Sequence, residues 1–165
     1  MVSVGVRVGV TGHTNISPAS LDVVYRALLT TIKEVCRHRP PHGVTCLAPG
    51  ADQLFARAVL AAHGTYEVIL PASDYRSRCC TPAQVPEFDE LMARAAEVRH
   101  TGFARSGRAA YAAANATMLG RSECLIAVWD GGPARGLGGT AEVVAAARQR
   151  GLPVRVVWPA GSRRE

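Results

Sequence analysis

Residues 124–147 have the sequence Cys124-Leu-Ile-Ala-Val-Trp129, then Asp130-Gly-Gly-Pro-Ala-Arg-Gly-Leu-Gly-Gly139, then Thr140-Ala-Glu142-Val-Val-Ala-Ala-Ala147. The first part is a short apolar run typical of a buried strand, the second is a glycine-rich loop, and the third is an alanine-rich helix. Such a succession directs free backbone N–H groups and the positive end of a helix dipole at one point. The stretch therefore predicts a site for an anion such as a phosphate group.

Glycines and a threonine give this loop the features of a phosphate site. Gly138 and Gly139 lack side chains and so allow a ligand to approach the backbone closely. Thr140 offers a hydroxyl group where the helix begins. Gly131 stands at the other end of the loop, directly after the strand. We expect these four residues to contact the ligand.

Two acidic residues flank the loop. Asp130 follows the strand and is well placed for a ribose hydroxyl or a metal ion. Glu142 lies in the first helical turn, where a carboxylate either stabilises the helix dipole or faces the ligand as a reactive group. If the protein is an enzyme, we expect Glu142 to be its catalytic residue, and the sequence leaves both interpretations open.

Short apolar segments alternate with helical patterns along the rest of the chain. We expect strands at 2–10, 44–47, 66–70, 98–101, 124–129 and 154–158, helices at 17–37, 52–62, 87–96, 106–119 and from 140, and a loop at 77–86. Strands that alternate with helices indicate crossover connections and a parallel sheet. The prediction is a single-domain α/β protein with a Rossmann-like, doubly wound parallel sheet and helices on both faces, spanning residues 1–160, followed by a basic C-terminal tail at 161–165.

Four polar turns follow predicted strands, at 11–13, 49–52, 73–75 and 130–140. In such a sheet the ligand lies beyond the carboxyl ends of the strands, so these turns should converge on one cleft. Gly12 and His13 in the first turn and Gly50 and Asp52 in the second are candidate binding residues. His13 either bonds a ligand or is only solvated, and Asp52 either contacts a ribose hydroxyl or caps its helix.

The composition fits a protein of the cytoplasm. No apolar run approaches the roughly 20 residues that a bilayer requires, and the N-terminus lacks the order of a signal peptide. The five cysteines form no C-x-x-C pair, so we expect free thiols in a reducing compartment. No residue cluster has the spacing of a zinc site, so no metal is predicted.

The net charge of +6 comes almost wholly from arginine, because Lys33 is the sole lysine among 19 basic residues. Arginine suits the bidentate binding of phosphate and carboxylate, which favours an anionic partner. The charges are scattered and aromatic residues make up only 5% of the chain. We therefore do not expect a nucleic acid as partner, nor a membrane.

Three segments resemble one superfamily, the Rossmann-like SLOG or LOG-like group, also known by the misnomer lysine decarboxylase-like. Gly138 to Glu142 resembles the glycine–threonine–acid motif of the LOG phosphoribohydrolases. Leu47-Ala-Pro-Gly50-Ala-Asp52 resembles the glycine-x-aspartate turn of DprA-like and YpsA-like members, and Tyr111 to Trp129 resembles the helix and strand before the LOG glycine loop. The resemblance extends from Val4 to Pro159 and implies a nucleotide or nucleotide-derived ligand, with no obligatory cofactor.

The chain departs from the LOG pattern at two catalytic positions. The helix that carries a LOG arginine has Ala114 and Asn115 there, and the LOG acid lies at the position of Val143, one residue after Glu142. One residue turns a helical side chain by about 100°. The resemblance therefore favours a sensor or carrier that binds a ligand through residues such as Asn115, with a nucleoside 5′-monophosphate phosphoribohydrolase and a DprA-like nucleic-acid binder as alternatives.

Self-association is also expected. The resemblance implies a homodimer or a larger homo-oligomer, and the helix predicted at 106–119 carries alanine around most of its circumference. Such a helix can pack on the sheet with one face and on a second copy with another.

Overall fold

A six-stranded sheet in which every neighbouring pair is parallel forms the centre of the protein. The computed structural model describes residues 5–133 and 139–165. The strand order is β4-β3-β2-β1-β5-β6. The strands are β1 (Val6–Gly12), β2 (Pro41–Thr45), β3 (Thr65–Leu70), β4 (Glu97–His100), β5 (Cys124–Val128) and β6 (Val154–Val157). The predicted α/β fold with a parallel sheet is confirmed.

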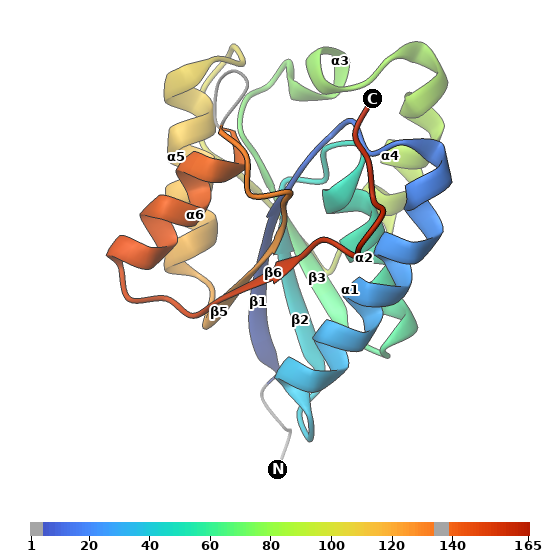
Figure 1. The fold of residues 1–165 in the computed structure, drawn as a ribbon. Coiled ribbons are helices and arrows are strands. Elements are labelled where there is room, and N and C mark those ends of the chain that lie inside the picture. The colour runs from blue at the N-terminus through green and yellow to red at the C-terminus, as the bar shows by residue number, and fades with distance from the viewer. Residues whose placement is uncertain (1–4, 134–138) are drawn as a thin grey trace.

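Helices cover both faces of the sheet (Figure 1). On one face lie α1 (Leu21–Cys36), α2 (Ala51–Ala61) and α4 (Val85–Ala93), and on the other lie α5 (Arg108–Gly120) and α6 (Thr140–Gln149). The short helix α3 (Tyr75–Cys79) lies beyond the carboxyl ends of the strands, and two 3-10 turns, η1 (Pro18–Ser20) and η2 (Pro82–Gln84), precede α1 and α4. The chain thus has the two helical layers of a doubly wound fold.

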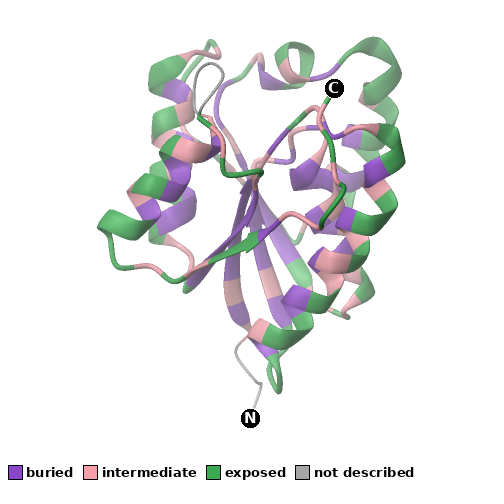
Figure 2. Ribbon diagram, viewed as in Figure 1, coloured by how far each residue is buried: buried purple, intermediate pink, exposed green. Residues whose placement is uncertain are grey.

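Each layer has its own hydrophobic core, and the central strands are buried between them (Figure 2). All five residues of β5 are buried, which explains why this strand appears in the sequence as an unbroken apolar run. On the α5 side, Ala114 packs with Met118 and Leu125. Small side chains on α5 allow the helix to approach the sheet closely.

The strand order reverses between β1 and β5. From β1 the chain winds outward through β2 and β3 to β4, then crosses back through α5 to β5 on the other side of β1. Ligands in open α/β sheets bind beyond the carboxyl ends of the strands near such a reversal. The first and fifth strand ends therefore frame the region in which a site is expected.

The loop predicted at 77–86 is wrong, because this segment contains the end of α3, the turn η2 and the start of α4. Thr81 and Gln84 form a reciprocal capping box, in which each side chain bonds the other residue's backbone. Proline is the first residue of η2 and the second residue of α4. These are helix-start signals, and they outweigh the missing hydrophobic period.

Strand β2 begins three residues earlier than predicted, at Pro41 instead of Val44. Proline is tolerated as the first residue of a strand. Gly43 fits because the ring of Phe55 occupies the space of a side chain, with its Cε1 atom 2.7 Å from where a Cβ would lie. Residues 41–43, which precede the strand predicted at 44–47, are therefore part of the sheet.

The C-terminal tail packs on the turn that follows β1. Arg164 forms an antiparallel bridge with Ile16, and the backbone N–H of Glu165 donates to the carbonyl of Asn15 at 2.8 Å. None of the helices in the described ranges has both the length and the apolar character that a membrane span requires.

Candidate functional site

The turns after β1 and β5 meet at His13 and Asp130. His13 is buried, and its Nε2 atom lies 3.1 Å from the backbone nitrogen and 3.2 Å from the Oδ1 of Asp130. Trp158 meets the imidazole edge-on, with ring centroids 5.4 Å apart. Arg164 reaches the same place and binds Asp130 Oδ2 at 2.8 Å. The two predicted site residues therefore contact each other and the tail.

The Asp130 carboxylate is held in its charged form. Partial burial alone would raise its pKa, but the backbone N–H of Gly132 and the charges of His13 and Arg164 hold that pKa below its usual range. Gly131, which lies between Asp130 and Gly132, has φ +84°, a backbone conformation that favours glycine in this tight turn. This group, which we call the His13–Asp130–Arg164 cluster, fastens three distant parts of the chain together.

Gly12 and Gly50 serve close packing. A Cβ on Gly12 would lie 2.4 Å from the Cβ of Ala51, and one on Gly50 would lie 2.7 Å from the carbonyl oxygen of His13. Gly50 also has φ +90°. The backbone N–H of Ala51 donates to that same His13 carbonyl at 3.1 Å. Both glycines therefore let the start of α2 approach the end of β1.

The N-terminus of α6 is described only in part. Gly138 lies outside the described residues, Gly139 precedes the first turn, and Thr140 is buried. Glu142 is exposed and lines a groove between α5 and α6, together with Arg108 and Arg150. The phosphate role of this segment stays a prediction.

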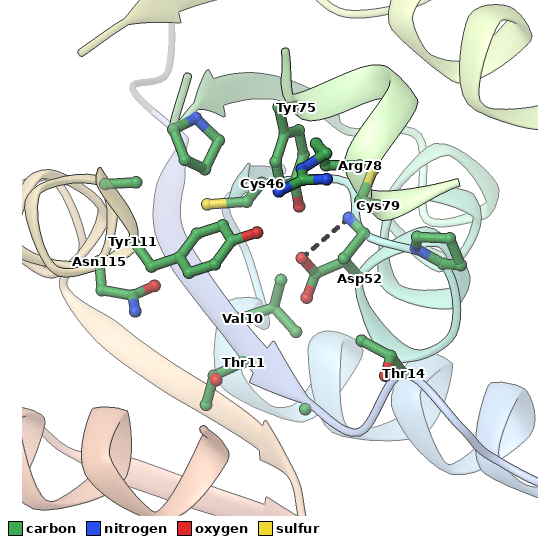
Figure 3. Close-up of a pocket in the computed structure, with 15 residues that line it drawn as sticks. Val10, Thr11, Thr14, Cys46, Asp52, Tyr75, Arg78, Cys79, Tyr111 and Asn115 are labelled. Atoms are coloured by element: carbon green, nitrogen blue, oxygen red, sulfur yellow. Dashed lines mark hydrogen bonds between the residues drawn. The ribbon is translucent and has the colours of Figure 1, made fainter. Parts of the chain in front are cut away.

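A cavity of about 350 Å³ lies beyond the carboxyl ends of β1, β2 and β3 (Figure 3). Its polar lining comes from the end of β1 and the turn after it, the residue after β2, the start of α2, helix α3 and helix α5. It consists of Thr11, Thr14, Cys46, Asp52, Tyr75, Arg78, Cys79, Tyr111 and Asn115. The volume lies in the range of about 300–1,000 Å³ that is usual for small-molecule sites. This cavity is the candidate binding site.

The predicted site residues divide between these places. Gly12, Asp52 and Asn115 line the cavity. Asn115 also lines the groove that contains Glu142. Helix α5 therefore lies between the cavity and the groove, and Asn115 contributes to both. Glu142 is not among the described residues that line the cavity.

Asp52 is the chemically distinctive group in the cavity. It is only 9% exposed, and its Oδ2 accepts a hydrogen bond of 3.2 Å from the backbone N–H of Ala48. The Ala48 N–H would lower the pKa of Asp52, but burial dominates and raises that pKa to about 7. The cap of α2 is Gly50, and no cap bond from a side chain is present there. Asp52 therefore does not act as the helix cap that the sequence had left open.

Two tyrosines of the cavity were not singled out as binding residues from the sequence. Tyr75 is buried, and its ring lies edge-on to that of Tyr111 with centroids 6.4 Å apart. Both hydroxyl groups point toward Asp52 (Figure 3). Tyr75 belongs to a turn that the sequence placed after a strand, but Tyr111 resembles a core residue of an alanine-rich helix. Only the packing of α3 against α5 across the strand ends reveals the pair.

Within residues 5–133 and 139–165, no cluster of three or more His, Cys, Asp or Glu side chains is arranged to hold a metal ion. All five cysteines are free thiols.

Solved structures of similar fold exist, although the sequence itself has no significant match. No protein-family model matches the sequence, and no curated protein matches it at a significant level. DNA processing protein A (DprA) from Streptococcus pneumoniae has a TM-score of 0.65 and 16% identity, over 95% of this chain and 52% of that protein. DprA from Helicobacter pylori, in a structure that concerns its single-stranded DNA binding mode, has a TM-score of 0.63 and 15% identity, over 97% and 69%.

A second kind of similar structure is a molybdenum cofactor binding protein from the phototrophic bacterium Rippkaea orientalis, with a TM-score of 0.58 and 20% identity, over 92% of this chain and 76% of that protein. The chain spans about half the length of the S. pneumoniae DprA. The chain shares a Rossmann-like α/β fold with these proteins, so the fold that the resemblance implied is confirmed. The two DprA structures give no support to the expectation that a nucleic acid is excluded as partner.

Proposed function

We propose that the protein binds a nucleotide or a nucleotide-derived small molecule in the cavity around Asp52, as a sensor or carrier. The observation that carries this proposal is the cavity itself, which lies beyond the strand ends near the reversal of strand order and combines aromatic rings, an amide, a carboxyl group and a guanidinium. Tyr75 and Tyr111 offer ring surfaces, Asn115 offers paired donor and acceptor atoms, and Arg78 offers a cation for a phosphate.

Binding without turnover is supported by the position of Glu142. A general acid or base must lie within hydrogen-bond reach of the bond that it helps to break. Glu142 lines the groove between α5 and α6, whereas Asp52 lines the cavity on the other side of α5. A LOG-like phosphoribohydrolase would need its acid at the ligand, so hydrolysis is the less favoured alternative.

A nucleic-acid binder of the DprA type is disfavoured by the arginine pairing. Ten described arginines lie within 3.8 Å of a carboxylate of this chain. Arg78 of the cavity is not among these ten, since the carboxylate of Asp74 lies 4.0 Å from its guanidinium. A paired guanidinium contributes less to phosphate binding, because the partner carboxylate must be displaced or left beside the phosphate. The net charge of +6 therefore overstates the attraction to DNA or RNA.

A thermal-shift screen of nucleosides, nucleotides and sugar phosphates tests the proposal. A ligand at 100 times its Kd stabilises the folded state by about 2.7 kcal/mol, which gives a clear rise in Tm. The same mixtures are then analysed for free base. A shift without base release supports a sensor or carrier. Base release that is abolished by Glu142→Gln would instead establish the hydrolase, and the absence of any shift would refute both.

We also propose that the protein is a homodimer or larger through α5. Ala109, Ala112 and Ala116 are exposed on this helix, beside the groove that contains Glu142. Sedimentation at micromolar concentration tests this proposal, and a 17.4 kDa monomer would refute it.

A further inference from the structure

The two carboxyl oxygens of Asp52 have different surroundings. Oδ2 accepts the N–H of Ala48 at 3.2 Å. Oδ1 has no hydrogen-bond donor among the described residues, although Asp52 as a whole is only 9% exposed. Because Asp52 lines the cavity, the solvent-accessible part of this carboxyl group is the part that faces the cavity (Figure 3). The site therefore contains a nearly buried polar atom that a ligand can satisfy.

No positively charged group lies beside Asp52 among the described residues that line the inner part of the cavity. The groups that face Asp52 are Cys46 after β2, Tyr75 and Cys79 of α3, and Tyr111 of α5. Burial raises the pKa of both thiols and of the Tyr75 hydroxyl, so these groups are uncharged near neutral pH. Arg78 is the sole cation among the described lining residues, and its side chain is 68% exposed at the mouth of the cavity.

When Asp52 is uncharged, its surroundings decide which of the two carboxyl oxygens carries the proton. The carboxyl oxygen that accepts the Ala48 N–H is the better carbonyl acceptor, so the proton of the neutral acid belongs on Oδ1. That O–H then points toward the cavity and requires an acceptor. A negative phosphate is unsuited to this deep end, because the only cation lies at the mouth.

We propose that Asp52 binds the ligand as an uncharged carboxylic acid, with its Oδ1–H donating to a ring nitrogen or carbonyl oxygen of an uncharged heterocycle. This inference rests on the proposed function and adds an orientation to it. The heterocycle enters the cavity first, and any phosphate lies toward Arg78 and the solvent. Asp52 is then the residue that selects for an acceptor on the ring.

The orientation makes ligand binding depend on pH. Only the protonated form of Asp52 donates, so the apparent Kd equals the intrinsic Kd divided by the protonated fraction. With a pKa of about 7, that fraction falls about tenfold between pH 6 and pH 8. The affinity for an uncharged ligand should fall by the same factor as pH rises. Asp52→Asn keeps a donor in this position at every pH and should remove the dependence.

Calorimetric titration with adenosine, guanosine, cytidine and uridine tests the inference, because these nucleosides carry ring acceptors and no phosphate. Ribose 5-phosphate is the control ligand, because it carries a phosphate and a sugar but no heterocyclic base. For the nucleoside that binds most tightly, we expect about tenfold weaker binding at pH 8 than at pH 6 with the wild-type protein. With Asp52→Asn we expect the same affinity at both values of pH, and with Asp52→Ala a loss of at least tenfold at pH 6.

The outcomes separate the inference from the proposed function. A nucleoside affinity that is constant or rises with pH, or that Asp52→Asn abolishes while the variant keeps its fold, would overturn the inference and leave nucleotide binding intact. Binding of ribose 5-phosphate with the same dependence on Asp52 would overturn it as well. If neither the nucleosides nor their 5′-monophosphates bind the wild-type protein at either pH, the proposed function itself fails.

Discussion

Asp52 and Asp130 both follow a strand of the same parallel sheet, yet the structure gives them opposite properties. Asp130 has Arg164 at 2.8 Å and His13 at 3.2 Å, and its pKa is lowered. Asp52 has one backbone N–H and no cation at depth, and its pKa is raised to about 7. Aspartate in the first turn of α2 and aspartate two residues beyond β5 thus differ in charge: Asp130 stabilises the fold through ion pairs, and Asp52 is the residue that we propose for ligand binding.

The start of α2 packs closely against the turn that contains His13, and disturbing this packing should have the largest effect on stability. Gly50→Val would place a Cβ 2.7 Å from the His13 carbonyl at a residue with φ +90°. We expect a loss of more than about 3 kcal/mol in the free energy of unfolding, because both the clash and the backbone conformation oppose valine. Urea denaturation measures it.

Gly107→Ala is the matched control, since a Cβ there meets nothing within 4 Å. A Gly50→Val protein as stable as Gly107→Ala would contradict the packing role of Gly50.

Removing the charge of Asp52 should stabilise the protein at alkaline pH. The folded-state pKa of about 7 lies above the ordinary value of 3.8, so the folded protein binds a proton that the unfolded chain has lost. The resulting cost is absent below pH 4, grows between pH 4 and 7, and is complete above pH 7. Asp52→Asn should therefore gain on the order of 2–4 kcal/mol at pH 8 and close to nothing at pH 4.

Urea denaturation of both proteins across this range provides the measurement. A gain that is equal at both ends of the range would show that ionisation of Asp52 is not its cause.

Removing the cation beside Asp130 should lower the free energy of unfolding, and this change should be smaller than the gain expected for Asp52→Asn. Arg164→Ala should cost about 1–2 kcal/mol at pH 7, since the side chain is only 12% exposed and its partner stays behind. Asp130 has a lowered folded-state pKa, so its contribution is present above the unfolded value of 3.8 and is lost as pH falls through the folded value.

Arg163→Ala serves as the control, because Arg163 contacts Ser17 and Ser20 through its backbone. If both variants lost the same stability, the ion pair with Asp130 would not hold the tail.

The smallest expected effect concerns nucleic acid. Because most described arginines are paired as Arg164 is, we expect only the weak nonspecific binding that is typical of a basic protein, with a Kd on the order of 10⁻⁵–10⁻⁴ M at physiological salt. Fluorescence anisotropy with labelled single-stranded DNA measures this affinity. Submicromolar binding that persists at 150 mM salt would favour the DprA-like alternative over the small-molecule site.

The sheet could be predicted from the sequence because it depends on local patterns. The apolar run at 124–128 and the helical spacing in α1 each carry their own signal. The difference between Asp52 and Asp130 could not be predicted, because it depends on the burial of Asp52 and on the approach of Arg164 to Asp130, which only the folded chain brings about. The turn that contains Asp52, the turn at 73–75 and Asn115 of α5 were identified from the sequence, whereas Arg78, Cys79 and Tyr111 were not. Local sequence patterns thus identified the edge of the sheet where a site is expected. Tertiary contacts determine which side chains at that edge are already paired within the protein.

Amide NMR of the isotopically labelled chain, titrated with adenosine 5′-monophosphate, tests most directly which of the two regions binds a ligand. We expect the largest chemical-shift changes in the segments that line the cavity, at residues 46–53, 75–79 and 111–115. Shift changes confined to His13, residues 130–133 and the tail would contradict this account, since they would place the ligand on the cluster that we describe as structural.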